Sequence, residues 1–324
     1  MANISLYDLA ILDRADAYTG LVEDVTTLAP EFTTISAMKR SGTYYEPVQR
    51  VALPTAQFRN VNAGVATSKS SYKKSVKEMF LVDVQLNMDE AIVKADQANL
   101  GAIWQLEASG AMRAGAILIG AQTYYGTSAD ASGFTGVRSQ LAFSVKAGGT
   151  TNSTSAYLLW LDPKEGCRYD VGNDGQFAIS QPRLQTVVDP NNSGKVYTAW
   201  VGNLNAWVGY NQMSNLSSYA ITGVTTTAAQ WLTDDRADQL LAKIPAMRRN
   251  GLHWFMNRTA ISTLRRSRST INLGVNPSGT TSGTLASYQA AGANGMPAFA
   301  PMPTELVGYP ITVTDSIVNT ETNS

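Results

Sequence analysis

The stretch from Asp89 to Tyr125, DEAIVKADQANLGAIWQLEASGAMRAGAILIGAQTYY, determines how this chain can fold. It contains no proline, and beyond Glu107 its only charged residue is Arg113. The pattern predicts a single helix roughly three times the usual length of about 11–12 residues, with a rise of about 1.5 Å per residue. A helix of this length is typical of proteins that brace a thin layer and is seldom needed in the core of an enzyme.

The start of this helix is expected at Asn87 or Asp89, because both side chains can cap a helix and an acidic group is favourable there. Four glycines interrupt the stretch: Gly101, Gly110, Gly115 and Gly120. Each costs about 1 kcal/mol of helix propensity relative to alanine. They indicate close packing against a sheet or a bend, and the alternative is two helices broken near Gly110.

The segment before the helix has a two-residue period. The apolar positions from Phe80 to Met88 alternate with Leu81, Asp83, Gln85 and Asn87, which predicts a half-buried strand. Residues 43–62 read as extended segments, and a turn is expected at residues 62–64. Residues 41–78 are therefore expected to project as a long two-stranded loop.

After the helix the pattern predicts a mixture of strands, helices and loops. A glycine-rich loop, TSADASGFTGV, follows Gly126, and it lacks the spacing of a phosphate-binding loop. Two helices are expected, one capped by Thr233 and one capped by Asn257. Strands are expected over residues 156–161, 184–188, 252–256 and 309–314, paired strands over 196–210, and a loop over 270–305.

Composition favours a chain that is covered by neighbours. The length of 324 residues corresponds to roughly two domains of about 150 residues. Hydrophobic residues make up 44% of the chain, whereas charged residues make up 15%, below the roughly 25% of ordinary soluble domains. Such a low charge suits a surface that copies of the same chain bury, and the alternative is a plain low-charge monomer. The six tryptophans and fourteen tyrosines also suit subunit interfaces.

The formal net charge of zero conceals blocks of opposite sign. The charged residues of segment 1–31 are mostly acidic, whereas those of segments 32–77 and 243–268 are mostly basic. Blocks of this kind are often solvated faces, but an acidic arm followed by a basic loop also suits head-to-tail contacts between identical subunits. We therefore predict that association weakens as salt concentration rises.

The chain offers little equipment for catalysis, cofactor binding or metal binding. Cys167 and His253 are the only residues of their types, and His253 is expected to be a satisfied strand residue. The acidic pair Asp234-Asp235 is best explained by the start of a helix. No nucleophile elbow or metal-ligand spacing is present, so we expect no enzyme, no cofactor and no metal. The sequence shows no signal peptide, and its longest apolar run, Ala114 to Ala121, is far shorter than the ~20 residues needed to span a membrane.

One basic face is a candidate for contact with nucleic acid. It consists of four arginines at near-helical spacing: Arg258, Arg265, Arg266 and Arg268. Contact with phosphates would be non-specific and sensitive to salt. The alternative is an ordinary solvated face, and no aromatic residues interleave with these arginines to stack on bases.

Two blocks of sequence carry a resemblance to a known family. The first runs from Leu232-Thr233-Asp234-Asp235 through Phe255-Met256-Asn257-Arg258 to Leu264-Arg265-Arg266-Ser267-Arg268. The second comprises Pro303-Thr304-Glu305, Gly308-Tyr309-Pro310-Ile311 and Thr314-Asp315-Ser316-Ile317. Together with the order of acidic arm, basic loop, strand, long helix, Gly133-Phe134-Thr135-Gly136 and terminal strand, they make nearly the whole chain resemble the major capsid proteins of tailed bacteriophages. That resemblance implies the α+β fold called Hong Kong 97-like.

The resemblance also implies a division of the chain. Residues 1–40 would be an N-terminal arm, and residues 41–78 an extended loop lying over a neighbouring subunit. A peripheral domain would comprise residues 79–139 and 301–324, with the spine helix at 89–125 and the last strand in its sheet. Residues 140–300 would form an axial domain. The basic residues of the loop would then lie at the subunit interface: Arg50, Arg59, Lys69, Lys73, Lys74 and Lys77.

The family role is to assemble as hexamers and pentamers into an icosahedral capsid that encloses double-stranded DNA. The resemblance places the chain in the virion and its assembly in the cytoplasm of the host bacterium. Because no long charged leader precedes the arm, it implies a separate scaffolding protein, besides a portal and a candidate decoration protein. Some relatives crosslink a loop lysine to an asparagine, but no matching motif surrounds Lys69, Lys73 or Lys74. Two alternatives remain open, a shell of the same fold that encloses cargo enzymes and a hydrolase using Ser or Asp.

Overall fold

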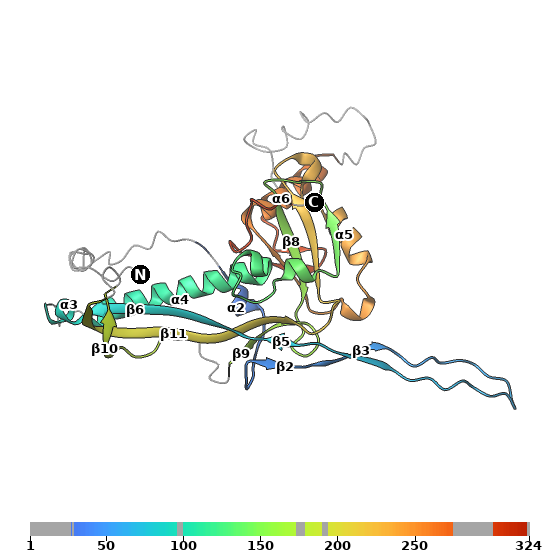
Figure 1. The fold of residues 1–324 in the computed structure, drawn as a ribbon. Coiled ribbons are helices and arrows are strands. Elements are labelled where there is room, and N and C mark those ends of the chain that lie inside the picture. The colour runs from blue at the N-terminus through green and yellow to red at the C-terminus, as the bar shows by residue number, and fades with distance from the viewer. Residues whose placement is uncertain are drawn as a thin grey trace.

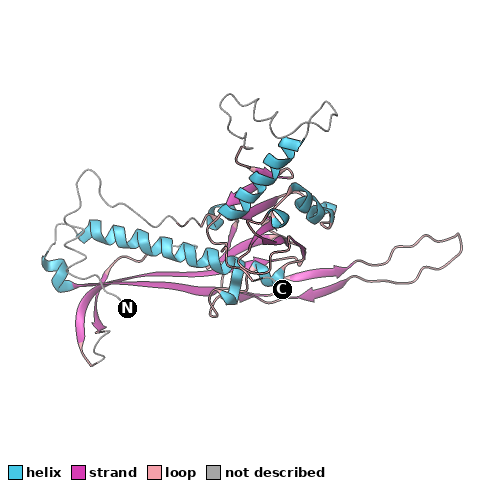
Figure 2. Cartoon of the chain, turned by 90° about the horizontal axis from the view of Figure 1, so that it is seen from above, coloured by secondary structure: helices cyan, strands magenta, loops and turns pink. Residues whose placement is uncertain are grey.

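The chain forms two lobes, each built on a β-sheet, and a long hairpin projects from the region where the lobes meet (Figures 1 and 2). The structure is a computed structural model that describes residues 27, 29–95, 100–172, 179–189, 194–274 and 301–322. Most of the expected arm, residues 1–26 and 28, and most of the loop expected over 270–305 lie outside the described residues.

The elongated lobe is a five-stranded sheet organised around one very long strand. Its members are β1 (Ala37–Lys39), β6 (Phe80–Asp89), β9 (Cys167–Val171), β10 (Arg183–Val188) and β11 (Val196–Gln212). Antiparallel pairing joins β11 to β10 over 196–201, to β6 over 199–208 and to β9 over 208–212. The prediction of two paired strands over 196–210 is therefore wrong, because this segment is a single strand. The alternation is weak there because one strand exchanges partners along its length and is partly covered on both faces.

The predicted long helix lies along this sheet (Figure 1). It appears as α3 (Glu90–Ala95) and α4 (Leu100–Tyr125), with residues 96–99 outside the described part of the chain. The carboxylate of Asp89 accepts a hydrogen bond from the backbone N–H of Ala91 at 2.8 Å, so Asp89 acts as the cap. Asn87 lies within β6 instead. The alternative of a break near Gly110 is wrong, because α4 continues through that residue.

Glycine allows close approach at specific points between α4 and its neighbours. A Cβ added at Gly120 would lie 2.3 Å from Oγ of Ser316, whereas one added at Gly110 would meet nothing within 4 Å. On the sheet, a Cβ at Gly202 of β11 would lie 2.3 Å from the ring of Trp104. The expectation of close packing therefore holds at Gly120 but not at Gly110.

The second lobe is a six-stranded sheet in the order β14-β15-β13-β8-β12-β7. The strands are β7 (Phe143–Lys146), β8 (Thr154–Trp160), β12 (Ser218–Val224), β13 (Leu252–Met256), β14 (Glu305–Leu306) and β15 (Tyr309–Val313). Every residue of β8 is buried. Leu158 and Trp160 belong to the core formed with α5 (Asp234–Ala242) and α6 (Arg258–Gly274), whereas Tyr157 and Leu159 belong to a second core.

That second core joins the two lobes. It combines Tyr157 of β8 and Phe255 of β13 with Tyr124 of α4, and it also includes Tyr169 and Tyr210 of the elongated sheet. The ring centroids of Tyr124 and Tyr157 are 5.1 Å apart, and those of Tyr169 and Tyr210 are 5.9 Å apart. Aromatic pairs at these distances add to the energy of burial, so the lobes are packed against one another through one continuous core.

Sheet membership differs from the expected division of the chain. The terminal strand β15 pairs in parallel with β13, with Ile311 opposite Trp254, and not with the sheet that contains β6. In turn, β9, β10 and β11 join β6 although they lie between residues 140 and 300. The pairing of β15 with β13 depends on backbone hydrogen bonds between segments far apart in the chain, and residue spacing does not reveal it.

Local signals predicted most other elements. The hydroxyl of Thr233 accepts a hydrogen bond from the N–H of Arg236 at the start of α5, and Oδ1 of Asn257 accepts one from Ala260 at 2.9 Å. The sequence did not predict β7, β9 or β12, and α6 continues to Gly274. Short helical segments complete the described chain: α2 (Glu31–Thr34), η1 (Gly126–Ser128), η2 (Val137–Gln140), η3 (Ala228–Gln230) and η4 (Ala246–Arg248).

Candidate assembly surfaces

Residues 41–78 form a two-stranded hairpin that extends beyond both lobes (Figure 2). Near the body, β2 (Tyr44–Tyr45) pairs with β5 (Lys77–Glu78), and further out β3 (Val48–Ala52) pairs with β4 (Ser71–Lys74). Its large apolar side chains are exposed, led by Phe58 at 108%, Val61 at 90% and Leu53 at 72% of full exposure. A group of exposed apolar side chains on one segment is typical of an interaction surface.

The basic residues predicted for this loop do not form one group. Arg50, Lys73 and Lys74 lie on the paired strands β3 and β4, and Lys74 approaches Glu46 at 3.5 Å. Arg59 lies near the tip and donates a hydrogen bond to the carbonyl of Ala63 at 3.0 Å. Lys69 is exposed on the returning segment.

Lys77, the sixth predicted residue, lies at the base of the hairpin and is partly buried. Burial lowers the pKa of its ammonium group, against the opposing influence of Asp170 and Cys167. Lys77 therefore faces the body of its own chain, unlike the exposed cations further out.

A buried carboxylate anchors the base of the hairpin. Asp170 of β9 is fully buried, and its carboxylate accepts hydrogen bonds from Arg168 at 3.1 Å, from Arg40 at 3.3 Å and from Asn211 at 2.9 Å. The hydroxyl of Tyr45, on β2, also donates to it. Burial, together with the hydrogen bond to Asp170, raises the pKa of Tyr45 to about 12, so the tyrosine remains a donor at any physiological pH.

This anchor was not predicted from the sequence, and no local signal reveals it. In CRYDV, residues 167–171, both charged residues occupy a strand and are buried. Such burial is tolerable because Asn211 and two residues more than a hundred positions away, Arg40 and Tyr45, bring hydrogen-bond donors to Asp170.

A second buried carboxylate joins the start of the described chain to its end. Glu31 of α2 accepts a hydrogen bond from the hydroxyl of Thr314 and lies against α4 at Gly120. Burial raises the pKa of Glu31, and hydrogen bonds oppose the shift. Glu321, also buried, accepts a hydrogen bond from Tyr125 at 2.6 Å. Both carboxylates hold terminal segments against the long helix.

The four predicted arginines of α6 differ in their surroundings. Arg258 forms an ion pair with Asp315 at 2.8 Å. Arg268 contacts both carboxylate oxygens of Asp234, at 2.6 and 2.8 Å, which raises the pKa of the guanidinium. Arg266 is exposed and Arg265 is partly exposed. Arg258 and Arg268 therefore fasten α6 to neighbouring segments.

Cys167 is buried and His253 is partly buried, and both lie on strands. Burial raises the pKa of Cys167 to about 12, so its thiol stays protonated. Nε2 of His253 lies 2.6 Å from the hydroxyl of Thr312, and burial lowers the pKa of the ring, which agrees with the prediction of a satisfied strand residue. The described residues contain no cluster of His, Cys, Asp and Glu that could hold a metal ion. None of the helices in the described part of the chain has the length and apolarity needed to cross a bilayer.

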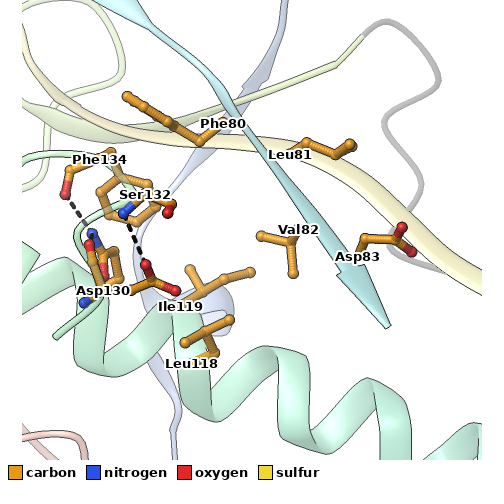
Figure 3. A pocket seen from close by; sticks show the side chains of 11 residues that line it. Phe80, Leu81, Val82, Asp83, Leu118, Ile119, Asp130, Ser132 and Phe134 are labelled. Carbon is orange, nitrogen blue, oxygen red and sulfur yellow. Dashed lines mark hydrogen bonds between the residues drawn. The ribbon is translucent and has the colours of Figure 1, made fainter. Parts of the chain in front are cut away.

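A cavity of about 260 Å³ lies between β6, α4 and the glycine-rich loop (Figure 3). Its apolar lining comes from β6, α4 and the glycine-rich loop: Phe80, Leu81, Val82, Leu118, Ile119 and Phe134. Asp83 and Asp130 also line it and are exposed. The cavity is thus an apolar recess that opens beside two carboxylates.

Comparison with solved structures identifies the fold. A chain in the near-atomic-resolution structure of bacteriophage epsilon15 is similar over 99% of this chain and 97% of that chain, with a TM-score of 0.64 and 16% sequence identity. Weaker similarity is found to a chain in the capsid of Myoviridae phage XM1, with a TM-score of 0.44, 8% identity, and coverage of 69% of this chain and 99% of that chain. No curated protein sequence matches the chain. The fold is the α+β, Hong Kong 97-like fold of phage capsids.

The sequence itself matches a family described as major capsid protein GP7 over residues 34–323, nearly the full length. The match includes the hairpin, both sheets, the long helix and the terminal strand. The chain therefore belongs to the GP7 family of major capsid proteins, the structural proteins of tailed-bacteriophage capsids.

Proposed function

We propose that this capsid protein assembles as hexamers and pentamers into an icosahedral shell around double-stranded DNA, and that it has no enzymatic activity. The main support for this proposal is the hairpin of residues 41–78 with its exposed apolar side chains. Its exposed apolar side chains have no cover on the described chain, and burying one of this size contributes about 1.5–3 kcal/mol. In a shell, the hairpin of residues 41–78 is an extended loop lying over the neighbouring subunit.

The two lobes take different positions in this proposal. The elongated sheet with α4 is the peripheral domain, and α4 is its spine helix. The six-stranded sheet with α5 and α6 is the axial domain around the five-fold and six-fold positions. The continuous core between the lobes supports this arrangement, because it lets each subunit act as one stiff plate.

Shortening the hairpin tests this proposal. Because Ala52 pairs with Ser71, residues 53–70 can be replaced by Asn-Gly, a two-residue turn that suits paired antiparallel strands. The shortened chain should fold, with an unchanged circular dichroism spectrum, and should form no shells by electron microscopy. The wild-type chain should form regular particles or capsomers. A wild-type chain that stays monomeric at high concentration, or a shortened chain that still forms shells, would contradict the proposal.

The content of the shell separates a capsid from a cargo-enclosing shell of the same fold. Virions should protect double-stranded DNA from nuclease, whereas a cargo shell would contain enzymes and no genome. We further propose that assembly takes place in the host cytoplasm with a separate scaffolding protein and a portal. Co-purification of a second protein with early particles, and its absence from virions, would support the scaffold.

We propose that the exposed side of α6 contacts the packaged DNA. Arg266 is exposed and Arg265 is partly exposed on this helix. Arg258 and Arg268 also lie on α6, and they form ion pairs with Asp315 and Asp234. Replacing Arg265 and Arg266 with glutamine should lower the salt concentration at which disrupted particles release DNA. The double variant R258Q/R268Q is the control, and it should affect stability more than DNA retention.

A further inference from the structure

We propose that the apolar cavity between β6 and α4 receives the side chain of Phe58 from the hairpin tip of a neighbouring copy. This docking site rests on the proposed shell and adds a specific contact to it. The cavity, with its lining residues, is called the β6–α4 cavity below (Figure 3).

The size and lining of the β6–α4 cavity suit an aromatic ring. Its volume is about 260 Å³, and an apolar protein cavity of about 150 Å³ is large enough to hold benzene. Phe80 and Phe134, whose ring centroids are 6.5 Å apart, lie on one side of it. An inserted ring could therefore make the offset or edge-to-face contacts that aromatic side chains prefer.

Charge supplies the second argument. The exposed carboxylates of Asp83 and Asp130 lie at the cavity, and the residue that follows Phe58 is Arg59. Arg59 hydrogen-bonds to the neutral carbonyl of Ala63, which leaves its positive charge uncompensated by that contact. A ring entering the cavity would thus bring a cation toward two anions, and complementary charges fix the register of an interface.

Exposure favours Phe58 over Met247, which comes next in exposure among the large apolar side chains of the described residues. Among the described residues, Phe58 is 108% exposed and Met247 is 93% exposed. Met247 lies in η4 on the body of the chain, and its neighbour Arg248 already contacts the Trp160 ring, with its guanidinium carbon 4.3 Å from the centroid. Phe58 lies on the hairpin that extends away from its own body, so it can reach a second copy (Figure 2).

An engineered disulfide tests the contact. The variant F58C/S132C places one thiol at the hairpin tip and one at the cavity, because Ser132 is exposed and lines it. The native Cys167 is buried, so it adds little background. Purified particles should be oxidised and run on a non-reducing denaturing gel. We expect loss of the monomer band and a ladder of covalent multimers that reductant removes, since a disulfide requires Cβ atoms about 3.5–4.5 Å apart.

The control F58C/T226C carries its second thiol at an exposed site in the other lobe and should stay monomeric on the same gel. Adding R59E to F58C/S132C should reduce the ladder, and adding D83K and D130K to that variant should restore it. Particles of F58C/S132C that show no ladder would overturn the docking site while leaving the shell intact. An absence of particles from the wild-type chain would instead overturn the proposed function.

Cryo-electron microscopy of wild-type particles decides the matter even where the cysteine variant does not assemble. Density for Phe58 of a neighbouring copy in the β6–α4 cavity would support the proposal. An empty cavity, another segment of the chain, or a different protein such as a scaffold in the same place would overturn it.

Discussion

Asp170 shows how much one side chain contributes to the placement of the hairpin. It is fully buried and accepts hydrogen bonds from Arg168, which is 4% exposed, and from Arg40. Removing one partner of a buried ion pair costs about 3–5 kcal/mol, because the other charge is left unpaired. We therefore expect D170N to lower the free energy of unfolding by about 3 kcal/mol in urea denaturation and to speed proteolysis at the hairpin base.

The matched control for D170N is E46Q, which breaks an exposed ion pair on the same hairpin. Lys74 and Glu46 are 3.5 Å apart and 70% and 46% exposed. Exposed pairs contribute about 0–1 kcal/mol, so E46Q should change stability by less than about 1 kcal/mol. Equal effects of the two substitutions would contradict an anchoring role for Asp170.

The raised pKa of Glu31 leads to a prediction of how the stability of the folded chain depends on pH. Its pKa in the folded chain is raised above the ordinary value of 4.5 because the carboxyl is buried. Between those two pKa values the folded chain binds more protons than the unfolded chain, so the contribution of Glu31 to stability is present at low pH and is lost as pH rises from about 4.5 through the folded pKa.

The substitution E31Q should flatten this decline. Glutamine keeps an oxygen that can accept the hydrogen bond from Thr314 and cannot ionise. Urea denaturation at a series of pH values should show a smaller loss of stability above pH 4.5 for E31Q than for the wild type. An unchanged slope would mean that the burial of Glu31 does not govern the titration.

At the scale of an element, two glycines of the long helix α4 have different surroundings, and the same substitution should affect stability in opposite directions at the two positions. Gly110 is exposed and has open space around its Cα, so G110A should stabilise the helix by up to about 1 kcal/mol. At Gly120 the new methyl group would lie 2.3 Å from Oγ and 3.2 Å from Cβ of the buried Ser316. Overpacking of this kind costs about 1–3 kcal/mol, so G120A should destabilise the chain.

Thermal or urea denaturation measures the stability of both variants. We expect it to rise for G110A and to fall for G120A, although both replace glycine by alanine in the same helix. A stabilising G120A would show that the C-terminal segment can move away from α4 without cost. A destabilising G110A would show that the exposed side of the helix is covered by something other than solvent.

At the scale of the whole molecule, assembly combines charge and apolar contact. The hairpin carries exposed cations and exposed apolar side chains on the same strands. We expect association of subunits to weaken as sodium chloride rises, because salt screens exposed charges over about 10 Å at 0.1 M. Sedimentation velocity across a salt series checks this, and salt-independent association would indicate that apolar burial alone holds the shell.

Much of the local structure could be predicted because its signals lie within a few residues of one another. The alternation from Phe80 to Met88 matches β6, and the caps at Thr233 and Asn257 begin α5 and α6. A strand face and a helix start each depend on neighbours close in the chain. The interface and DNA-facing roles of the basic residues stay predictions. Residue spacing could not reveal that Lys77 is partly buried or that Arg258 and Arg268 are paired with distant carboxylates.

The sequence by itself determined the long helix, the projecting hairpin segments and the scarcity of catalytic groups, because periodicity, turn residues and composition carry that information. Only the tertiary structure decided that β11 is one strand with three partners, that β15 pairs with β13, and that Asp170 lies buried among Arg40, Arg168 and Tyr45. These outcomes depend on contacts between segments far apart in the chain. Their energies come from backbone pairing and desolvation that no local pattern of residues records.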